Sequence, residues 1–506
     1  MNTPCLITER YQDQIVGTLS CFDRILIYGT LPDICHSNAM ASQLTRRGMR
    51  LFDHGEFVNP IRDMLHVNAK KVAGEGGVPI EFIRRFNDFK KEKKIQEIVK
   101  TLGVKSGLVH VFSAMENCNC FKPWHDKKTG KTFMTSSSGR CLHYYFYFID
   151  DILGLLHVRV PTWAPFRLQI CFNGHDWLAS HLQMSGVKFK KNDNAFVDIA
   201  DFAKAQELAD HLDPVALQSR LEQYARIACP VDALFPAGWH WSIAQIEYST
   251  DIIFKRAEDL ASIYDSIKTR AINEVKIDNI ATFLGHNGLN PNYEGEGGSR
   301  YDTLIEGTRV KHSLGHTSIK LYDKFSLVLR IETTTSDVSF FKHRRKVEHR
   351  DGGFSMKVAP VKKTIHSLGI VRELLGASNK RYLSFISCLK DDSIGRKELL
   401  KVSNKVKDDA GRSHRGINFF LEDDLDLVLA VLRPEHLISG VTARMLRRIL
   451  PDWTGSRISR AIRRLREHGL LKKIAKTFKY YMTTLGNKVS MAAMRMRECE
   501  IIPALS

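Results

Sequence analysis

Residues 155–172 read LLHVRVPTWAPFRLQICF, and their apolar and polar side chains alternate on both sides of the turn PTWAP. Before the turn, Leu156, Val158 and Val160 alternate with His157 and Arg159. Alternation with a period of two is typical of a β-strand that has one buried and one exposed face. The stretch therefore predicts an antiparallel β-hairpin with an apolar and a polar face.

The segments around this hairpin predict further strands and helices. An aromatic strand over 143–150 precedes it, and a helix over 176–184 follows the dipeptide Asn173-Gly174. The order of strand then helix repeats over 195–212, and apolar residues over 308–335 are spaced as in an antiparallel meander. Helices mixed with antiparallel strands predict the α+β fold class and not a doubly wound parallel sheet.

Residue patterns divide the 506 residues into four parts. Apolar residues at helical spacing, such as Phe57, Ile61 and Leu65, predict a helical N-terminal region. A central α+β body follows, and its Gly-rich loop predicts a break between two subdomains near 285–300. A charged segment poor in apolar residues then predicts a linker before the C-terminal part. The predicted boundaries of the four parts are 1–105, 106–390, 391–416 and 417–506.

The charge of the chain narrows the class of partner. Lys and Arg number 75 against 56 Asp and Glu, which gives a net charge of +19 and a pI near 9.4. This excess favours a polyanion, and no run reaches the ~18 apolar residues of a membrane span. The first residues, MNTPCLITERYQDQ, lack the pattern of a signal peptide, and ten scattered cysteines favour reduced thiols. We therefore expect a cytoplasmic protein that binds nucleic acid and not a membrane.

The C-terminal part has the pattern of a winged helix. Three amphipathic helices are predicted over 422–432, 441–450 and 455–467, followed by a two-stranded wing over 470–483. In a winged helix-turn-helix domain the third helix enters the major groove of DNA. Twelve Lys and Arg against two acidic residues lie between positions 440 and 480, which favours DNA or RNA as the ligand. The alternative is a protein-interaction domain with a solvated basic face.

Individual basic residues are candidate contacts to nucleic acid. Arg457, Arg460 and Arg464 are spaced to share one face of the third helix, and each guanidinium suits guanine or phosphate. Residues 341–363 hold eight Lys and Arg with phenylalanines among them, a combination that suits single-stranded or structured nucleic acid. The alternative for 341–363 is a charged surface loop. The predicted contacts are Arg457, Arg460, Arg463, Arg464, Lys476, Lys479, Arg344, Arg345, Lys320 and Lys324.

Longer words of the sequence resemble those of a large bacterial family. The words are LVHVFSAMENC, KPWHDKKTGKTF, RCLHYYFYFIDDILGLLHVRVPTWAPFRLQICFNGHDWLASHL and IKLYDKFSLVLRIETTTSDVSFFKHRR. The family consists of proteins of similar size and undefined function, often several per genome, and some members carry a MarR-type regulator label. The resemblance implies a C-terminal winged helix and a mobile element.

The segment IKLYDKFSLVLRIE, residues 319–332, also resembles a strand pair of phage and plasmid replication initiators. Such initiators combine a nicking domain on an antiparallel sheet with winged helices. Their metal motif has two histidines separated by one hydrophobic residue, and His157-Val158-Arg159 has one of the two. This resemblance implies a factor that acts on DNA in the manner of a replication initiator.

Cysteines and histidines form the first candidate metal site. Cys118, His125, Cys141 and His143 lie within a short segment, and thiolate and imidazole are zinc ligands. Four such ligands close a tetrahedral Zn²⁺ site if a loop between positions 124 and 139 lets the chain fold back. The alternative is a set of reduced core cysteines with a surface histidine.

Carboxylates on polar strand faces form the second candidate site. A metal-dependent nuclease needs two or three carboxylates to hold Mg²⁺ or Mn²⁺ against the scissile phosphate. Glu332, Glu247 and Asp151 are the predicted catalytic residues, with lysines of the strand before Glu332 supplying positive charge. The alternative is an ion pair between Arg330 and Glu332 that only stabilises the sheet.

These patterns together predict a nucleic-acid-binding protein of mobile-element or replication-initiator character. DNA is the expected ligand, and structured RNA is a second candidate. If the protein is an enzyme, the carboxylates predict a divalent-metal-dependent nuclease, because P-loop, dinucleotide and nucleophile-elbow motifs are missing from the sequence. The alternative is a non-enzymatic, MarR-like transcriptional regulator.

Overall fold

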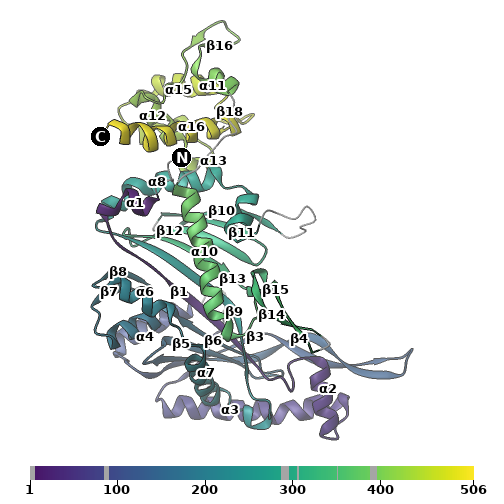
Figure 1. Ribbon diagram of the computed structural model, residues 1–506. Helices are drawn as coiled ribbons and strands as arrows, with labels where there is room; N and C mark the ends of the chain where they lie inside the picture. Colours follow the sequence, from purple (N-terminus) through teal and green to yellow (C-terminus); the bar gives the residue numbers. More distant parts are fainter. Residues whose placement is uncertain are drawn as a thin grey trace. The chain divides into compact units, whose positions relative to one another are not determined.

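The computed structural model describes residues 6–84, 90–286, 296–304, 307–349, 352–387 and 396–505 (Figure 1). Over these ranges, one large sheet is accompanied by helices, so the predicted α+β class is confirmed. In spatial order its eleven strands are β10 (Gly297–Leu304), β11 (Gly307–Leu314), β12 (Thr317–Lys324), β13 (Val328–Thr335), β9 (His240–Phe254), β1 (Ile15–Thr30), β6 (Leu168–Asn173), β5 (Gly154–Pro161), β4 (Lys131–Asp150), β3 (Gly107–Asp126) and β2 (Ile80–Phe82).

The chain divides into two compact units. Unit 1 comprises Met1–Gly17, Asp251–Ile331 and Ser378–Ser506. Unit 2 comprises Thr18–Thr250 and Glu332–Ala377. Strands β1, β9 and β13 therefore contribute residues to both units.

Unit 2 contains the hairpin from which the sequence prediction started. β5 and β6 pair antiparallel, with Leu156 opposite Phe172 and Arg159 opposite Gln169. The aromatic strand predicted over 143–150 is the second half of β4, which pairs antiparallel with β5. Both predictions are therefore confirmed. The alternation of apolar and polar residues within each segment was sufficient to identify these strands.

The loop predicted between positions 124 and 139 is wrong. β3 and β4 pair antiparallel from Gly107 opposite Ile149 to Asp126 opposite Lys131. Residues 131–139 therefore continue β4 to a tight turn after Asp126. Thr132, Phe133 and Thr135 favour this extended conformation, since β-branched and aromatic side chains fit a pleated strand.

The helical prediction for 1–105 is wrong over residues 15–30, which form β1 between β9 and β6. Leu19, Ile25 and Ile27 are buried at odd-numbered positions, which is the period of a strand. The predicted helical character holds after β1, in α2 (Ser37–Arg46), α3 (His54–Glu75) and α4 (Lys91–Leu102).

Polar caps begin the next helices of unit 2. The side chains of Asn173, Asp201 and Asp213 each accept a hydrogen bond from a first-turn backbone N–H group. The helices predicted after positions 175 and 201 are confirmed. The elements that complete unit 2 are α5 (Gly174–Met184), β7 (Phe189–Asn192), β8 (Ala195–Ile199), α6 (Phe202–Asp210), α7 (Pro214–Ala228), β14 (Lys342–Glu348) and β15 (Phe354–Pro360).

Unit 1 contains the predicted meander and helices. β10, β11 and β12 pair antiparallel in sequence order, and α8 (Ala257–Glu274) and α9 (Ile277–Phe283) precede them. The Gly-rich loop predicted near 285–300 falls largely on 287–295, outside the described residues. α10 (Leu368–Ser387) follows β15 along the chain. Among the helices of the described ranges, none combines the length and the apolar character needed to cross a bilayer.

The C-terminal part has helices and a hairpin at the predicted positions. Buried Leu446, Ile458, Ile462, Leu471 and Val489 belong to one apolar core that joins these elements. The elements are α12 (Glu422–Val431), α13 (Pro434–Ser439), α14 (Ala443–Ile449), α15 (Gly455–Glu467), β18 (Leu471–Lys473), β19 (Tyr480–Met482) and α16 (Thr484–Met496).

The linker predicted over 391–416 is corrected for its described residues, 396–416. They form α11 (Arg396–Ser403) and a short hairpin of β16 (Val406–Lys407) and β17 (Ser413–His414). Val402 is buried in the same apolar core as Ile417 and Leu427. The charged composition of this segment therefore reflects a solvated outer face, and its few apolar residues pack inward.

Candidate metal centre and nucleic-acid surfaces

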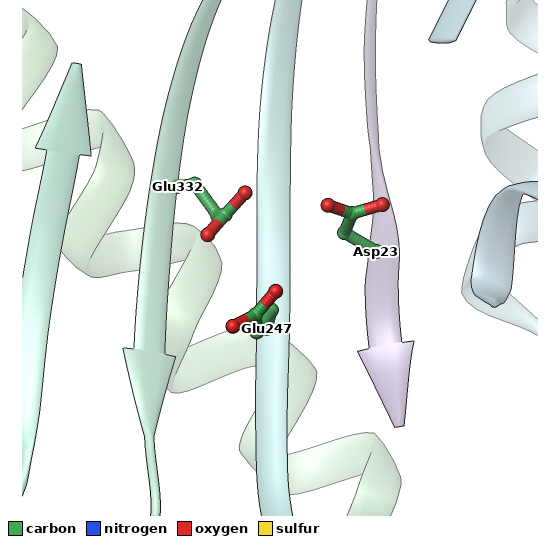
Figure 2. A group of neighbouring side chains, drawn as sticks. All are labelled: Asp23, Glu247 and Glu332. Carbon is green, nitrogen blue, oxygen red and sulfur yellow. The ribbon is translucent and has the colours of Figure 1, made fainter. Parts of the chain in front are cut away.

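Three carboxylates from adjacent strands meet in unit 2 (Figure 2). Asp23 lies on β1, Glu247 on β9 and Glu332 on β13. One oxygen atom of each carboxylate lies within 4.8 Å of the corresponding oxygen atoms of the other two. Asp23 and Glu332 are buried, and Glu247 is half-buried. We call these three residues the acidic trio.

Polar neighbours hold Asp23 in place. Asn194 Nδ2 donates a hydrogen bond to Asp23 Oδ1 over 2.7 Å, and Nδ1 of the buried His175 lies 3.1 Å from the same oxygen atom. Gly174 permits this arrangement, because a Cβ atom there would lie 2.1 Å from the carbonyl oxygen of Phe22. Glycine therefore lets the start of α5 approach β1 closely enough to bring His175 to Asp23.

Glu247 and Glu332 each accept a hydrogen bond from a residue two positions away on the same strand. Gln245 Nε2 donates to Glu247 Oε1 over 3.2 Å, and Thr334 Oγ1 donates to Glu332 Oε1 over 3.2 Å. Three negative charges at this spacing repel one another by several kcal/mol. Carboxylate oxygens are the ligands that Mg²⁺ and Mn²⁺ prefer, so the residues present fit such an ion.

The structure brings together two of the three predicted catalytic residues. Glu247 and Glu332 belong to the acidic trio, but Asp151 does not. Asp151 follows β4, its side chain is 71% exposed, and it forms an ion pair with Arg220 over 3.1 Å. β5 and β6 separate β4 from β1 in the sheet, so Asp151 lies on the wrong strand for the trio.

Sequence reasoning missed Asp23, which takes the third place. A signal was present in the sequence, because Asp23 interrupts the buried alternation of Leu19, Cys21, Ile25 and Ile27. A charged residue inside such a pattern needs a partner or a function. Because residues 1–105 were predicted to be helical, this strand pattern was not recognised.

The predicted surroundings of Glu332 are corrected as well. Arg330 is fully buried and pairs with Asp251, with Nε 2.7 Å from Oδ1 and a terminal nitrogen 2.6 Å from Oδ2. The sequence analysis gave an ion pair between Arg330 and Glu332 as the alternative to a nuclease site. In the structure, Arg330 instead pairs with Asp251 and stabilises the sheet there. Lys320 and Lys324 lie on β12, where Lys320 is opposite Lys311 of β11.

The four predicted zinc ligands do not converge. Cys141 Sγ lies 3.8 Å from His143 Nδ1, and Cys118 hydrogen bonds to Cys141. His125, however, is seven residues beyond Cys118 on the same extended strand, which corresponds to about 23 Å. Its Nδ1 lies 2.9 Å from Thr132 Oγ1. Of the described residues, the acidic trio is the only group of three or more candidate ligands at metal-binding distances.

Cys118, Cys141 and His143 have perturbed acidities. A hydrogen bond from Cys141 lowers the pKa of Cys118 below the ordinary value, and the nearby charge of Arg159 acts in the same direction. The same hydrogen bond and burial raise the pKa of Cys141. Burial, assisted by Arg159, lowers the pKa of His143 to about 4, so its imidazole is neutral near pH 7.

Two arginines of α15 that were predicted to contact nucleic acid form ion pairs with the start of α12. Arg464 pairs with the buried Asp424, and its side chain is 12% exposed. Arg457 pairs with Asp423, and its guanidinium carbon lies 4.0 Å from the ring centre of Trp453. Arg464 therefore stabilises the packing of α15 on α12, and its predicted role as a nucleic-acid contact is corrected.

Other basic residues of this region are exposed as predicted. Arg460 and Arg463 lie on the outer face of α15, and Lys476 and Lys479 lie on the hairpin of β18 and β19. Arg466 is a further exposed arginine of α15 that sequence reasoning omitted. The candidate nucleic-acid surface of the C-terminal part therefore centres on the middle and end of α15.

The hairpin of β14 and β15 carries the second predicted basic surface. Arg344 is exposed, whereas Arg345 is half-buried and donates from Nε to the carbonyl oxygen of Pro360 over 3.0 Å. Lys346 Nζ lies 3.9 Å from the ring centre of Phe354. Basic and aromatic side chains therefore share this hairpin, as the sequence predicted.

Comparisons with known proteins give no relative for this chain. No family model, no curated protein and no solved structure was found to match it.

Proposed function

We propose that unit 2 cleaves phosphodiester bonds of nucleic acid with Mg²⁺ or Mn²⁺ bound by Asp23, Glu247 and Glu332. The observation that supports this proposal is the approach of these carboxylates, from three different strands, to within 4.8 Å of one another. Three like charges would weaken the sheet unless a cation or strong donors offset their repulsion. A cation bound between the three carboxylates would offset this repulsion.

The members of the trio have different roles in this proposal. The buried Asp23 and Glu332 would hold the ion, and His175 and Asn194 contact Asp23. Glu247 is the partly exposed member of the trio and would be the one nearest to solvent. A bound ion would neutralise charge at the phosphate and lower the pKa of a water molecule.

The C-terminal part is proposed to be a winged helix that binds duplex DNA through Arg460, Arg463 and the hairpin lysines. These exposed cations suit phosphate contacts. A DNA-binding domain joined to a nuclease agrees with a mobile-element or replication-initiator factor acting in the cytoplasm. Structured RNA is the second proposed substrate, because the basic and aromatic hairpin of β14 and β15 suits unpaired bases.

A cleavage assay tests the nuclease proposal. Full-length protein is incubated with labelled single-stranded, duplex and hairpin oligonucleotides in Mn²⁺ or in EDTA. Wild type is expected to cleave at least one substrate only with metal, and Glu247→Gln is expected to lower the rate at least 100-fold. Asp151→Asn is the matched control, because Asp151 is an exposed carboxylate outside the trio. Equal cleavage by the wild type and Glu247→Gln would reject the proposed site.

The second candidate function is a non-enzymatic transcriptional regulator. The exposed Arg460 and Arg463 favour it, since they support DNA binding without any role for the trio. Salt-dependent binding to duplex DNA, combined with no cleavage of any of the three substrates, would favour the regulator.

A further inference from the structure

A second site in unit 2 is a groove of about 670 Å³. Its walls come from β1, β3, β4, β5, β6 and β9 and from the turn between β5 and β6. Arg159 and Arg167 line it, together with Tyr28 and Trp163. Among the described residues that line the groove, none is Asp or Glu. Its lining therefore combines positive charge with aromatic rings, which suits an anionic ligand that has flat groups.

The polar face of three adjacent strands forms one wall of the groove. Arg159 of β5 is opposite Gln169 of β6, which in turn is opposite Tyr28 of β1. The guanidinium carbon of Arg167 lies 3.7 Å from the ring centre of Tyr28. Arg167 and Tyr28 thus form a stacked pair, and Arg167 is exposed. Nucleobases stack on aromatic rings and on guanidinium planes of this kind.

Arg159 is oriented by its neighbours. Its terminal nitrogen pairs with Glu116 Oε2 over 2.7 Å, and its Nε donates to the hydroxyl oxygen of Tyr145 over 3.1 Å. Its side chain is 18% exposed, whereas Arg167 is exposed. Arg159 is therefore held in the wall of the groove by Glu116 and Tyr145, whereas Arg167 is exposed to a ligand.

The groove and the acidic trio share the strands β1 and β9. Tyr28 and Arg24 are four residues apart and share a face of β1. Arg24 has a raised pKa, caused first by Cys171 and also by the nearby Glu247. Along β1, five residues separate Asp23 from Tyr28, which corresponds to about 17 Å. Because this separation is an odd number of residues, the side chains of Asp23 and Tyr28 point to opposite faces of β1, and the groove is a site separate from the trio.

We propose that this groove binds single-stranded nucleic acid, with a base stacked on the pair of Arg167 and Tyr28 and with phosphates beside Arg159 and Arg167. A single strand is favoured over a duplex because its bases are free to stack on protein side chains. Binding in the groove does not depend on the proposed nuclease function.

Binding of a fluorescein-labelled dT₁₂ oligonucleotide to the full chain in EDTA tests the proposal by fluorescence anisotropy. Tyr28→Ala should raise the Kd about 5- to 150-fold, the cost of losing one base–aromatic stack. Tyr28→Phe keeps the ring and should bind like wild type. Arg167→Gln should weaken binding, whereas Arg226→Gln should not, because Arg226 is an exposed arginine of α7 outside the groove. Duplex affinity should be unchanged in all four variants.

Photocrosslinking of wild type keeps the test independent of how the variants fold. An oligonucleotide with 5-iododeoxyuridine should crosslink to the peptides that contain Tyr28 or Trp163. Crosslinks confined to residues 412–482, or a wild-type Kd for Tyr28→Ala, would overturn the proposal. An equal loss of duplex affinity in Tyr28→Ala would also overturn it. If the wild type binds dT₁₂ but shows no metal-dependent cleavage, the nuclease proposal is rejected and the proposal of single-strand binding in the groove is retained.

Discussion

Replacing Glu332 by Gln should make the metal-free protein more stable, although most substitutions of buried residues destabilise. Two unit charges 4.8 Å apart repel by about 3.5 kcal/mol at an effective dielectric constant near 20. The substitution removes two of the three repulsive pairs and keeps an oxygen acceptor for Thr334 Oγ1. Because the donors around the trio already offset part of the ~7 kcal/mol, we expect a gain of about 1–3 kcal/mol.

Thermal unfolding of the full chain in EDTA and in Mn²⁺ measures both parts of this prediction. A ligand present at 100 times its Kd adds about 2.7 kcal/mol of stability. That corresponds to a Tm increase of about 5 °C in a domain of roughly 250 residues. Wild type should gain this increase with Mn²⁺. Glu332→Gln should start from a higher Tm in EDTA and gain less than about 1 °C.

Asp151→Asn is the control, because it neutralises an exposed carboxylate whose partner, the half-buried Arg220, keeps its second partner Asp150. Its Tm should stay within about 1 °C of wild type in both conditions. A lower Tm of Glu332→Gln in EDTA, together with an undiminished response to Mn²⁺, would refute the reasoning. In that case Glu332 would stabilise the sheet through its hydrogen bonds alone.

Four other predictions concern groups outside the trio. Arg464→Ala should lower the free energy of unfolding of the C-terminal part by about 2 kcal/mol in urea melts, because it removes one of the two arginines that pair with the buried Asp424, and Arg415 remains. Arg463→Ala should leave stability unchanged and reduce the salt slope of duplex binding by about one. Alkylation of Cys118 should begin at lower pH than for an ordinary thiol of pKa about 8.5, since the thiolate is the reactive form. Cys141→Ala should return the alkylation of Cys118 to the pH of an ordinary thiol. Cys141→Ser keeps a hydrogen-bond donor and should leave the lowered pKa of Cys118 in place. Any zinc found in purified protein by metal analysis should be unaffected by His125→Ala, because this residue lies far along β3 from Cys118.

Local patterns predicted the elements whose signals are short-range. The hairpin of β5 and β6 follows from alternation over 155–172, and α15 follows from its amphipathic spacing. Glu247 was identified because an acidic residue interrupts an apolar strand, where a charge needs a partner. Glu332 was identified from strand alternation, which placed it on a polar face beside Arg330; the structure buries both residues. Each of these inferences used residues within one or two elements.

Contacts between distant segments were beyond the sequence. Asp23 joins Glu247 and Glu332 only because β1 lies beside β9 in the sheet. Local alternation of apolar and polar residues does not determine the order of strands in a sheet. Helical spacing placed Arg464 on the same face of α15 as Arg457. Its side chain instead pairs with Asp424, which lies 40 residues earlier at the start of α12. His125 failed as a ligand for a similar reason, because β3 continues straight where a folded loop was expected.

Anomalous scattering from crystals of the full chain grown with Mn²⁺ tests the central proposal most directly. We expect a peak about 2 Å from a carboxylate oxygen of each of Asp23, Glu247 and Glu332. The peak should be missing in Glu332→Gln crystals grown under the same conditions. A wild-type map without a peak at the trio, or with peaks only at exposed carboxylates such as Asp151, would contradict it.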